Sequence, residues 1–167
     1  MKKILDSGER REFKSGAVRD VAEGKGRCDL LPLDAVADLL KMRNKEVTPL
    51  FDIYEYIYSG EVRCLLNAIH LFCSYIGIDE TTAMLEVAKH YEEGAKKYDE
   101  RNWEKGIDLH CYIDSGVRHY LKWLRGDDDE PHDRAFIWNM LGAIWTQTHR
   151  PEHIDLPFVQ YSKEIEG

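Results

Sequence analysis

Four consecutive carboxylates, Asp127, Asp128, Asp129 and Glu130, form the chemically most distinctive stretch of the sequence. Carboxylates this close together repel one another, and a helix N-terminus offsets only about 0.3–1 kcal/mol per charge. A divalent metal ion would offset far more. Pro131 suits the first position of a helix, which makes Glu130 the expected cap of that helix. The acidic run therefore predicts a helix start that is either a solvated turn or part of a metal pocket.

A row of cations leads into this acidic stretch. Residues 114–126 carry an apolar stripe with helical spacing, and Asp114 or Ser115 is expected to cap the helix. Arg118, Lys122 and Arg125 recur at i, i+4 and i+7 along it. A cationic ridge that ends at an anionic pocket suits a ligand that carries both phosphates and a metal ion.

A third candidate is Glu92, on a helix predicted over residues 80–98. Its spacing places it on the same side as Leu85 and Ala88, where an unpaired carboxylate would be costly. Either Lys96, one turn later, or a metal ion would neutralise it. Glu93 is expected to face solvent instead, as a partner of Lys97 at i, i+4.

Two polar segments carry further candidates for ligand binding. Residues 1–31 are rich in glycine and form a polar arm, whose cations could hold a phosphate or a base edge beside exposed backbone amides. These cations are Arg19, Lys25 and Arg27. Residues 99–113 are expected to form a loop, in which Trp103 beside Asn102 could stack on a base or pin the loop to the core.

Composition limits the class of protein. With 167 residues, of which 43% are hydrophobic, the chain can bury the core of one domain. A formal net charge of −8 disfavours binding to polymeric nucleic acid, which depends on a positive surface. The four cysteines have no CxxC spacing, nothing resembles a signal peptide, and no apolar run approaches the roughly 20 residues of a membrane span. We expect a cytoplasmic protein with reduced thiols and no membrane contact.

Six helical patterns and no convincing strand predict an all-α fold, a helical bundle with an N-terminal arm and an extended C-terminal tail. Residues 61–76 are the most continuously apolar and are expected to form the central buried helix. The expected organisation is an arm at 1–31, a catalytic-type domain at 32–150 and a tail at 151–167 that covers the bundle.

Four segments resemble the phage-associated dATP/dGTP diphosphohydrolase N-terminal domain family, which we take as a relative of the all-α MazG-like nucleotide pyrophosphohydrolases. They read SGAVRDVAEGKGRCDLLP, GAKKYDERNWEKG, DSGVRHYLKWLRGDDDEPHDRA and WN. The likeness covers about residues 15–40 and 84–145, and residues 41–80 look like a variable helical insertion. A phage origin would place the protein in the host cytoplasm.

The resemblance implies an enzyme that depends on Mg²⁺ or Mn²⁺ and cleaves a purine deoxynucleoside triphosphate to monophosphate and pyrophosphate. MazG-like enzymes hold metal with an ExxE pair on one helix and an ExxD pair on another. Glu130 and Asp133 match the second pair, whereas Glu92 and Glu93 stand side by side where the first is expected. The implied metal ligands are Glu92, Asp128, Glu130 and Asp133.

The remaining roles follow from this chemistry. His119 or His132 could orient the attacking water or act as a general base, or could lie one step behind the metal ligands. Cations would neutralise the triphosphate, and Asn102, Trp103 and Asn139 are candidates for recognition of the nucleoside. The cations are Lys96, Arg118, Lys122 and Arg125, with Arg19, Lys25 and Arg27 from the arm closing over the nucleotide. A small bundle exposes much of such a site, so we expect a homodimer or a larger homo-oligomer to complete it.

Two other functions stay open at this point. His132 and Asp133 form the dipeptide of HD-type phosphohydrolases, in which His90 or His119 and Asp155 would complete the metal site. The missing ExxE pair also allows a protein that binds and sequesters a nucleotide without turning it over.

Overall fold

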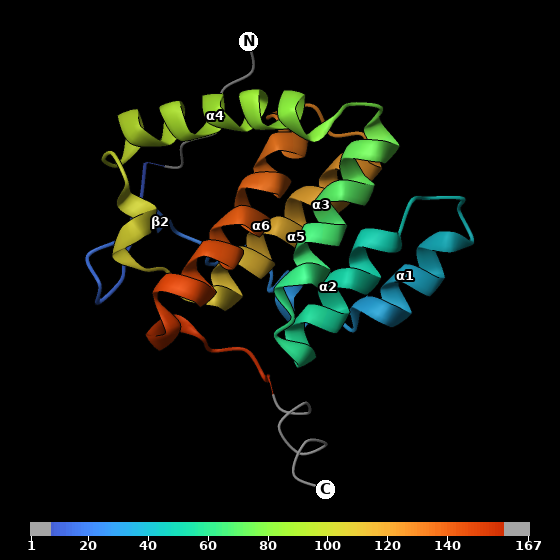
Figure 1. The fold of residues 1–167 in the computed structure, drawn as a ribbon, viewed down its shortest axis with the longest axis horizontal. Coiled ribbons are helices and arrows are strands. Elements are labelled where there is room, and N and C mark those ends of the chain that lie inside the picture. The colour runs from blue at the N-terminus through green and yellow to red at the C-terminus, as the bar shows by residue number, and fades with distance from the viewer. Residues whose placement is uncertain (1–7, 159–167) are drawn as a thin grey trace, which may run out of the picture.

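Two helices, α5 (Leu109–Arg125) and α6 (His132–His149), form the centre of the computed structural model, which describes residues 8–158 (Figure 1). α6 buries side chains around most of its circumference, among them Phe136, Met140 and Ala143. Gly142 lets the two helices approach closely, because a Cβ there would overlap the ring of Tyr112. A helix that is apolar on all sides belongs in the core.

Three further helices pack beside this pair. α2 (Thr48–Ser59) and α3 (Val62–Ile76) form a hairpin joined at Gly60, which has a positive φ of 70°, and α1 (Leu33–Lys41) packs against α2. Phe72 of α3 meets the rings of Tyr120 and Phe136 edge-on at 5.8 and 5.0 Å. α3 is therefore packed against the centre, although the sequence predicted it as the central helix.

Helix α4 (Glu80–Lys97) lies across the end of the bundle (Figure 1). Asp79 caps it by accepting a hydrogen bond from the backbone N–H of Thr82 at 3.0 Å, as the sequence predicted. Its buried residues are Ala83, Val87 and His90.

The predicted orientation of α4 is wrong. Leu85 is 72% exposed and the side chain of Glu92 is 62% exposed, whereas Glu93 lies largely buried. The helix packs against α6 along a narrow stripe, and its many small apolar residues do not reveal which side that stripe occupies.

The N-terminal arm contains a short strand hairpin that the sequence did not predict. β1 (Arg10–Glu12) pairs antiparallel with β2 (Val18–Asp20), so that Arg11 faces Arg19, and the 3₁₀ turn η1 (Cys28–Leu30) follows. Phe13 and Ala17 of the intervening turn are buried in the core. This short hairpin departs from the expectation of an arm without strands or core residues.

Long-range hydrogen bonds attach the arm to the bundle. The side-chain amide of Asn102 accepts from the N–H of Val18 and donates to its carbonyl, both at 2.8 Å. Buried Asp114 accepts from the N–H of Cys28 at 2.7 Å. Asn102 and Asp114 therefore serve as backbone anchors for the arm.

The segment predicted as a loop over residues 99–113 contains the 3₁₀ turn η2 (Asn102–Lys105) and the first turn of α5. α5 thus begins at Leu109, and Asp114 lies inside the helix and does not cap it. After α6, the 3₁₀ turn η3 (Pro151–His153) leads to Phe158, whose ring packs on Tyr56. Residues 1–7 of the arm and 159–167 of the tail lie outside the described residues.

The all-α prediction is confirmed, since six helices and one small sheet account for the regular structure of residues 8–158. In this described part of the chain, none of the helices combines the length and apolar character required to span a bilayer.

Candidate functional site

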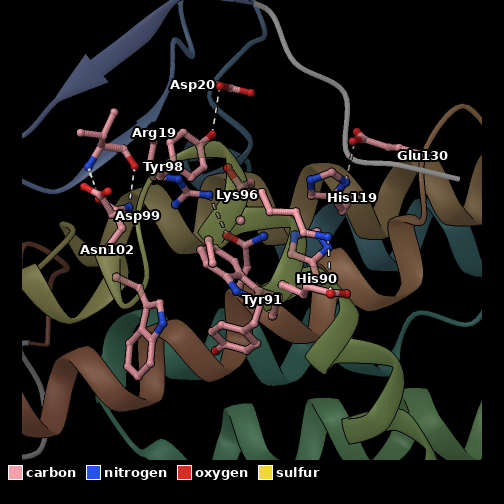
Figure 2. Close-up of a pocket in the computed structure, with 18 of the residues that line it drawn as sticks. Arg19, Asp20, His90, Tyr91, Lys96, Tyr98, Asp99, Asn102, His119 and Glu130 are labelled. Atoms are coloured by element: carbon pink, nitrogen blue, oxygen red, sulfur yellow. Dashed lines mark hydrogen bonds and ion pairs between the residues drawn. The ribbon is translucent and has the colours of Figure 1, made fainter.

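A cavity of about 1050 Å³ opens between the arm, α4, the η2 turn and α5 (Figure 2). Its volume is at the upper end of the roughly 300–1,000 Å³ typical of small-molecule sites. Aromatic rings supply apolar walls, namely Tyr91, Tyr98, Trp103 and Trp138. A cavity of this size, with flat rings on its walls, can enclose a ligand as large as a nucleotide.

Six cations from four segments line this cavity. The arm contributes Arg19 and Lys25, α4 contributes Lys96, Arg101 stands at the start of the η2 turn, and α5 contributes Arg118 and Lys122. All but Arg101 are among the ligand-binding residues expected from the sequence, and the fold brings them around one space. These cations can contact the phosphates of a ligand, while five carboxylates line the same cavity: Asp20, Glu92, Asp99, Glu100 and Glu130.

Arg19 is the cation most firmly built into the wall. Its Nη2 donates to Asn139 Oδ1 at 3.0 Å, and its guanidinium lies 5.3 and 5.5 Å from the ring centres of Tyr112 and Trp138. Nη1 of Arg19 is buried and has no hydrogen-bond partner among the described residues. The fold thus places in the cavity wall a charged group that keeps hydrogen-bonding capacity unused among the described residues.

Arg118 connects the cavity to the arm. Its Nη2 donates to Asp114 Oδ2 at 2.6 Å and to the carbonyl of Gly26 at 2.7 Å. Because Asp114 also holds Cys28, one buried carboxylate fixes both the arm and a cation of the cavity wall.

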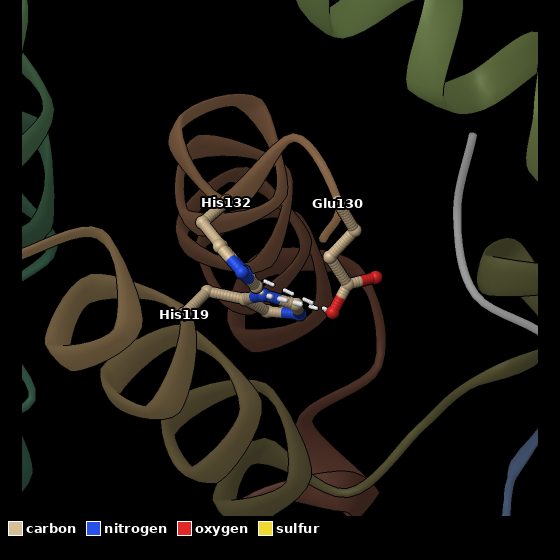
Figure 3. A group of neighbouring side chains, drawn as sticks. All are labelled: His119, Glu130 and His132. Atoms are coloured by element: carbon tan, nitrogen blue, oxygen red, sulfur yellow. Dashed lines mark hydrogen bonds and ion pairs between the residues drawn. The ribbon is translucent and has the colours of Figure 1, made fainter. Parts of the chain in front are cut away.

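Two histidines and one glutamate converge at the side of the cavity (Figure 3). Nδ1 of His119 and Nδ1 of His132 are 2.9 Å apart, and Glu130 Oε1 lies 3.7 and 3.8 Å from them. His132 Nε2 contacts Asp129 Oδ1 at 2.7 Å. A proton held on Nε2 by Asp129 leaves the lone pair of His132 Nδ1 directed at His119 and Glu130.

Burial also controls the protonation of the cavity histidines. Burial, followed by the nearby His132, lowers the pKa of His119 well below its usual value. Burial, followed by the Arg134 guanidinium, lowers the pKa of His90 to about 4. Both rings are therefore neutral near pH 7 and keep a lone pair available.

The four predicted metal ligands are not brought together. The carboxylate of Glu92 lines the cavity but pairs with Lys96 at 3.4 Å, and Asp128 is exposed. Asp133 Oδ1 accepts from the backbone N–H of Arg134 at 2.8 Å. Only Glu130 of this set lies in a cluster of possible ligands among the described residues. Glu93 accepts from Arg134 at 2.6 Å, and Lys97 donates to Asp20 at 2.6 Å. The pairing of Glu93 with Lys97 stays a prediction.

The other candidates fall into two groups. Arg27 pairs with Asp29, and Arg125 pairs with Asp127, and neither arginine lines the cavity. Asn102 and Trp103 do line it, together with Asn139. Trp103 also packs edge-on against Trp145 at 4.8 Å, which fits the alternative that it pins its loop to the core.

The sequence reading missed several residues of the cavity wall. His90 had been considered only as a possible metal ligand, and the rings of Tyr91, Tyr98 and Trp138 were not nominated at all. Tyr98 donates to Asp20 at 3.0 Å, which joins the end of α4 to β2. No local sequence pattern predicts these residues, since their common feature is a place on a cavity wall that the fold assembles from segments distant in sequence.

The donor set decides which metals the cluster suits. Two imidazole nitrogens and one carboxylate oxygen match Mn²⁺ and other divalent transition metals, whereas Mg²⁺ favours a shell of oxygen atoms. The residues present therefore fit one of the two expected ions, Mn²⁺, better than the other. Asp133 and Asp155 do not join this cluster, which removes two of the ligands expected for HD-type chemistry.

Comparisons with known proteins agree with the family suggested by the sequence. The family model described as dATP/dGTP diphosphohydrolase, N-terminal, matches residues 69–155, which run from α3 to the segment after α6 and include the histidine cluster. No curated protein sequence and no solved structure matches the chain significantly.

Proposed function

Because the chain belongs to the dATP/dGTP diphosphohydrolase N-terminal family, we propose that it hydrolyses a purine deoxynucleoside triphosphate in the cavity beside the histidine cluster. In this reaction a water oxygen bonds to the α phosphorus and the bond from that phosphorus to the α–β bridging oxygen breaks. A nucleoside monophosphate and pyrophosphate are released, and one proton of the water is given up.

One observation carries the proposal: the His119–Glu130–His132 cluster adjoins the cavity that six cations line. Phosphoryl transfer needs cations beside the negatively charged pyrophosphate as it departs, and a metal close to the reacting phosphorus. Arg118 and Lys122 stand on the same helix as His119, at neighbouring positions along it. We therefore place the triphosphate along this face of α5.

The nucleoside would occupy the opposite part of the cavity, against Trp138 and Tyr91. Arg19 lies over Trp138, and its buried Nη1 has no hydrogen-bond partner in residues 8–158, which suits an acceptor on the base or on a phosphate. A purine offers such acceptors at the edge of a large stacking surface. This placement explains why an arginine, and not a lysine, would be useful at position 19.

The cluster would hold a divalent ion through His119 Nδ1, His132 Nδ1 and Glu130. Bound there, the ion would polarise phosphate oxygens and neutralise charge that builds up during the reaction. His119 must be neutral either to hold the ion or to take up the proton of the water, and its lowered pKa favours that form. Asp129 keeps His132 in the tautomer that presents Nδ1 to the cluster.

The decisive experiment identifies the products after incubation with dATP, dGTP or a pyrimidine control, in the presence of Mn²⁺ or Mg²⁺. We expect monophosphate and pyrophosphate from the purine nucleotides, with Mn²⁺ more effective than Mg²⁺. Glu130→Gln is expected to lower kcat at least about 100-fold, since it removes a charged group at the reacting centre. Glu92→Gln is the matched control and should retain most of the activity, because Glu92 is exposed and paired with Lys96.

Other outcomes would replace the proposal. Nucleoside plus inorganic triphosphate would move the assignment to HD-type chemistry. Nucleotide recovered intact but bound would indicate a sequestering protein. Loss of activity in Glu92→Gln with full activity in Glu130→Gln would contradict the placement of the reaction. The expected homodimer stays a prediction, and sedimentation velocity on the same samples measures it.

A further inference from the structure

A second cluster of potential metal ligands lies outside the nucleotide cavity, where the segment after α6 meets the first turn of α5. Asp108, His110 and Asp155 each direct a ligand atom to one place, and these atoms lie within 4.8 Å of one another. None of the three lines the cavity. The cluster joins residues 45 or more positions apart, so the fold, and not local sequence, assembles it.

Each of the three side chains is held by a further partner. Asp155 Oδ1 accepts from the backbone N–H of His110 at 2.9 Å, which leaves Oδ2 to contact the Nδ1 atom of the ring. Asp108 Oδ1 contacts Nδ1 of His153 at 2.9 Å. His110 Nε2 lies 3.4 Å from Cys111 Sγ. Orientation of ligands by such outer partners is characteristic of metal sites in proteins.

We propose that Asp108, His110 and Asp155 form a zinc-binding site that fastens the segment after α6 to the start of α5. One imidazole nitrogen and two carboxylate oxygens are donors that Zn²⁺ accepts, and water would complete the coordination. Donors at about 2.1 Å from a tetrahedral ion are about 3.4 Å apart, so small side-chain movements are sufficient to close the set. The site is independent of the catalytic proposal.

Charge supports a cation at this position. The two carboxylates face the point where a cation would sit. Hydrogen bonding to Asp155, followed by that to Cys111, raises the pKa of His110 to about 10, so a divalent ion bound there would replace the ring proton as the charge that balances the carboxylates. Arg11 contacts Cys111 Sγ at 3.6 Å and so lies on the Nε2 side of His110. The Nδ1 side, which faces the carboxylates, is the side from which metal would bind.

The segment that would be fastened is attached to the bundle by side chains and not by regular structure. Residues 154–158 form no regular structure beyond the η3 turn, and their apolar contacts with the core come from Ile154, Leu156 and Phe158. A bond through Asp155 would lie in the middle of these three side chains. Metal binding would therefore hold all three against the bundle.

The test is zinc binding by the full chain after removal of metal with a chelator, with no nucleotide present. Isothermal titration should show that His110→Ala binds one Zn²⁺ fewer than the wild type. Asp155→Asn should weaken that ion at least about 100-fold, because it loses a charged ligand. The Asn side-chain oxygen can still accept from the His110 N–H, so this variant keeps the local backbone bond. His70→Ala is the matched control, since His70 contacts Glu80 on the surface without a third ligand.

A second measurement separates this site from the histidine cluster of the cavity. In a Glu130→Gln background, zinc should still slow amide hydrogen exchange of residues 150–158, and His110→Ala should abolish that effect. The proposal is overturned if His110→Ala and Asp155→Asn bind as many zinc ions, as tightly, as the wild type. It is equally overturned if Glu130→Gln alone removes all bound zinc.

Discussion

The neutral, buried imidazole of His90 makes acid stability a direct test of how the cavity is built. The ring lies beside Trp138 with a centre-to-centre distance of 5.6 Å, and its Nδ1 is buried without a hydrogen-bond partner among the described residues. Its pKa falls from 6.5 in the unfolded chain to about 4 in the fold. The unfolded state therefore binds more protons than the folded state below pH 6.5.

The sign and size of the effect follow from these two pKa values. Stability contributed by neutral His90 is fully present above pH 6.5 and is lost as the pH falls towards 4. The loss amounts to about 2 kcal/mol at pH 5 and about 3 kcal/mol at pH 4, relative to pH 8. His90→Phe keeps a ring beside Trp138 and has no proton to bind, so this variant should escape the loss.

The assay is urea unfolding followed by tryptophan fluorescence, at intervals between pH 4 and pH 8, on metal-free protein without nucleotide. We expect the free energy of unfolding of wild type minus that of His90→Phe to fall by about 3 kcal/mol across this range. Other titrating groups, His119 included, are present in both proteins and largely cancel. A difference that stays constant with pH, at equal m-values, would refute the assignment of a neutral buried His90.

Two further substitutions test packing. Glu93→Gln should destabilise the protein by about 2 kcal/mol in thermal unfolding, because Arg134, 6% exposed, loses a charged partner. Glu92→Gln on the exposed side of α4 should change stability by less than about 0.5 kcal/mol. Equal effects of the two substitutions would contradict the observed orientation of α4. Gly142→Ala should cost about 1–3 kcal/mol, since a Cβ overlaps the fully buried ring of Tyr112, and an unchanged melting temperature would show that the two central helices are not in close contact.

Helix ends that are set by neighbouring residues, such as caps and glycine stops, could be predicted from the sequence. Thr48-Pro49 and Gly60 bounded α2 to within a residue, and Asp79 correctly capped α4. The start of α5 was missed because Asp114, a good N-cap by type, is instead occupied by Arg118 and the N–H of Cys28. A buried polar residue with one partner 86 positions away in sequence cannot be distinguished from a cap by composition.

The strands of the arm were not predicted because they too depend on partners distant in sequence. Each strand has three residues, too few to display the alternation that marks a strand, and Asn102 supplies hydrogen bonds to β2 that a third strand would otherwise make. Arg19 and Lys25 were nominated from their type alone. Their position at one cavity with Lys96 depends on Asn102 and Asp114, which attach the arm to the bundle. The sequence therefore predicted that these cations could bind a ligand, but not where they lie in the fold.

The histidine cluster was more accessible to sequence reasoning than the carboxylate set that the family suggested. His119 lies six residues before the end of α5, about 9 Å along its axis, and yet its ring touches His132 in the first turn of α6. The elbow of residues 126–131 must therefore run back alongside α5 before α6 begins. This return carries Asp129 and Glu130 onto the two rings, while Asp128 stays exposed. An elbow of six residues between two antiparallel core helices is long enough to fold back. His119 and His132 flank this elbow at similar distances from Gly126, so such a return brings their rings into contact.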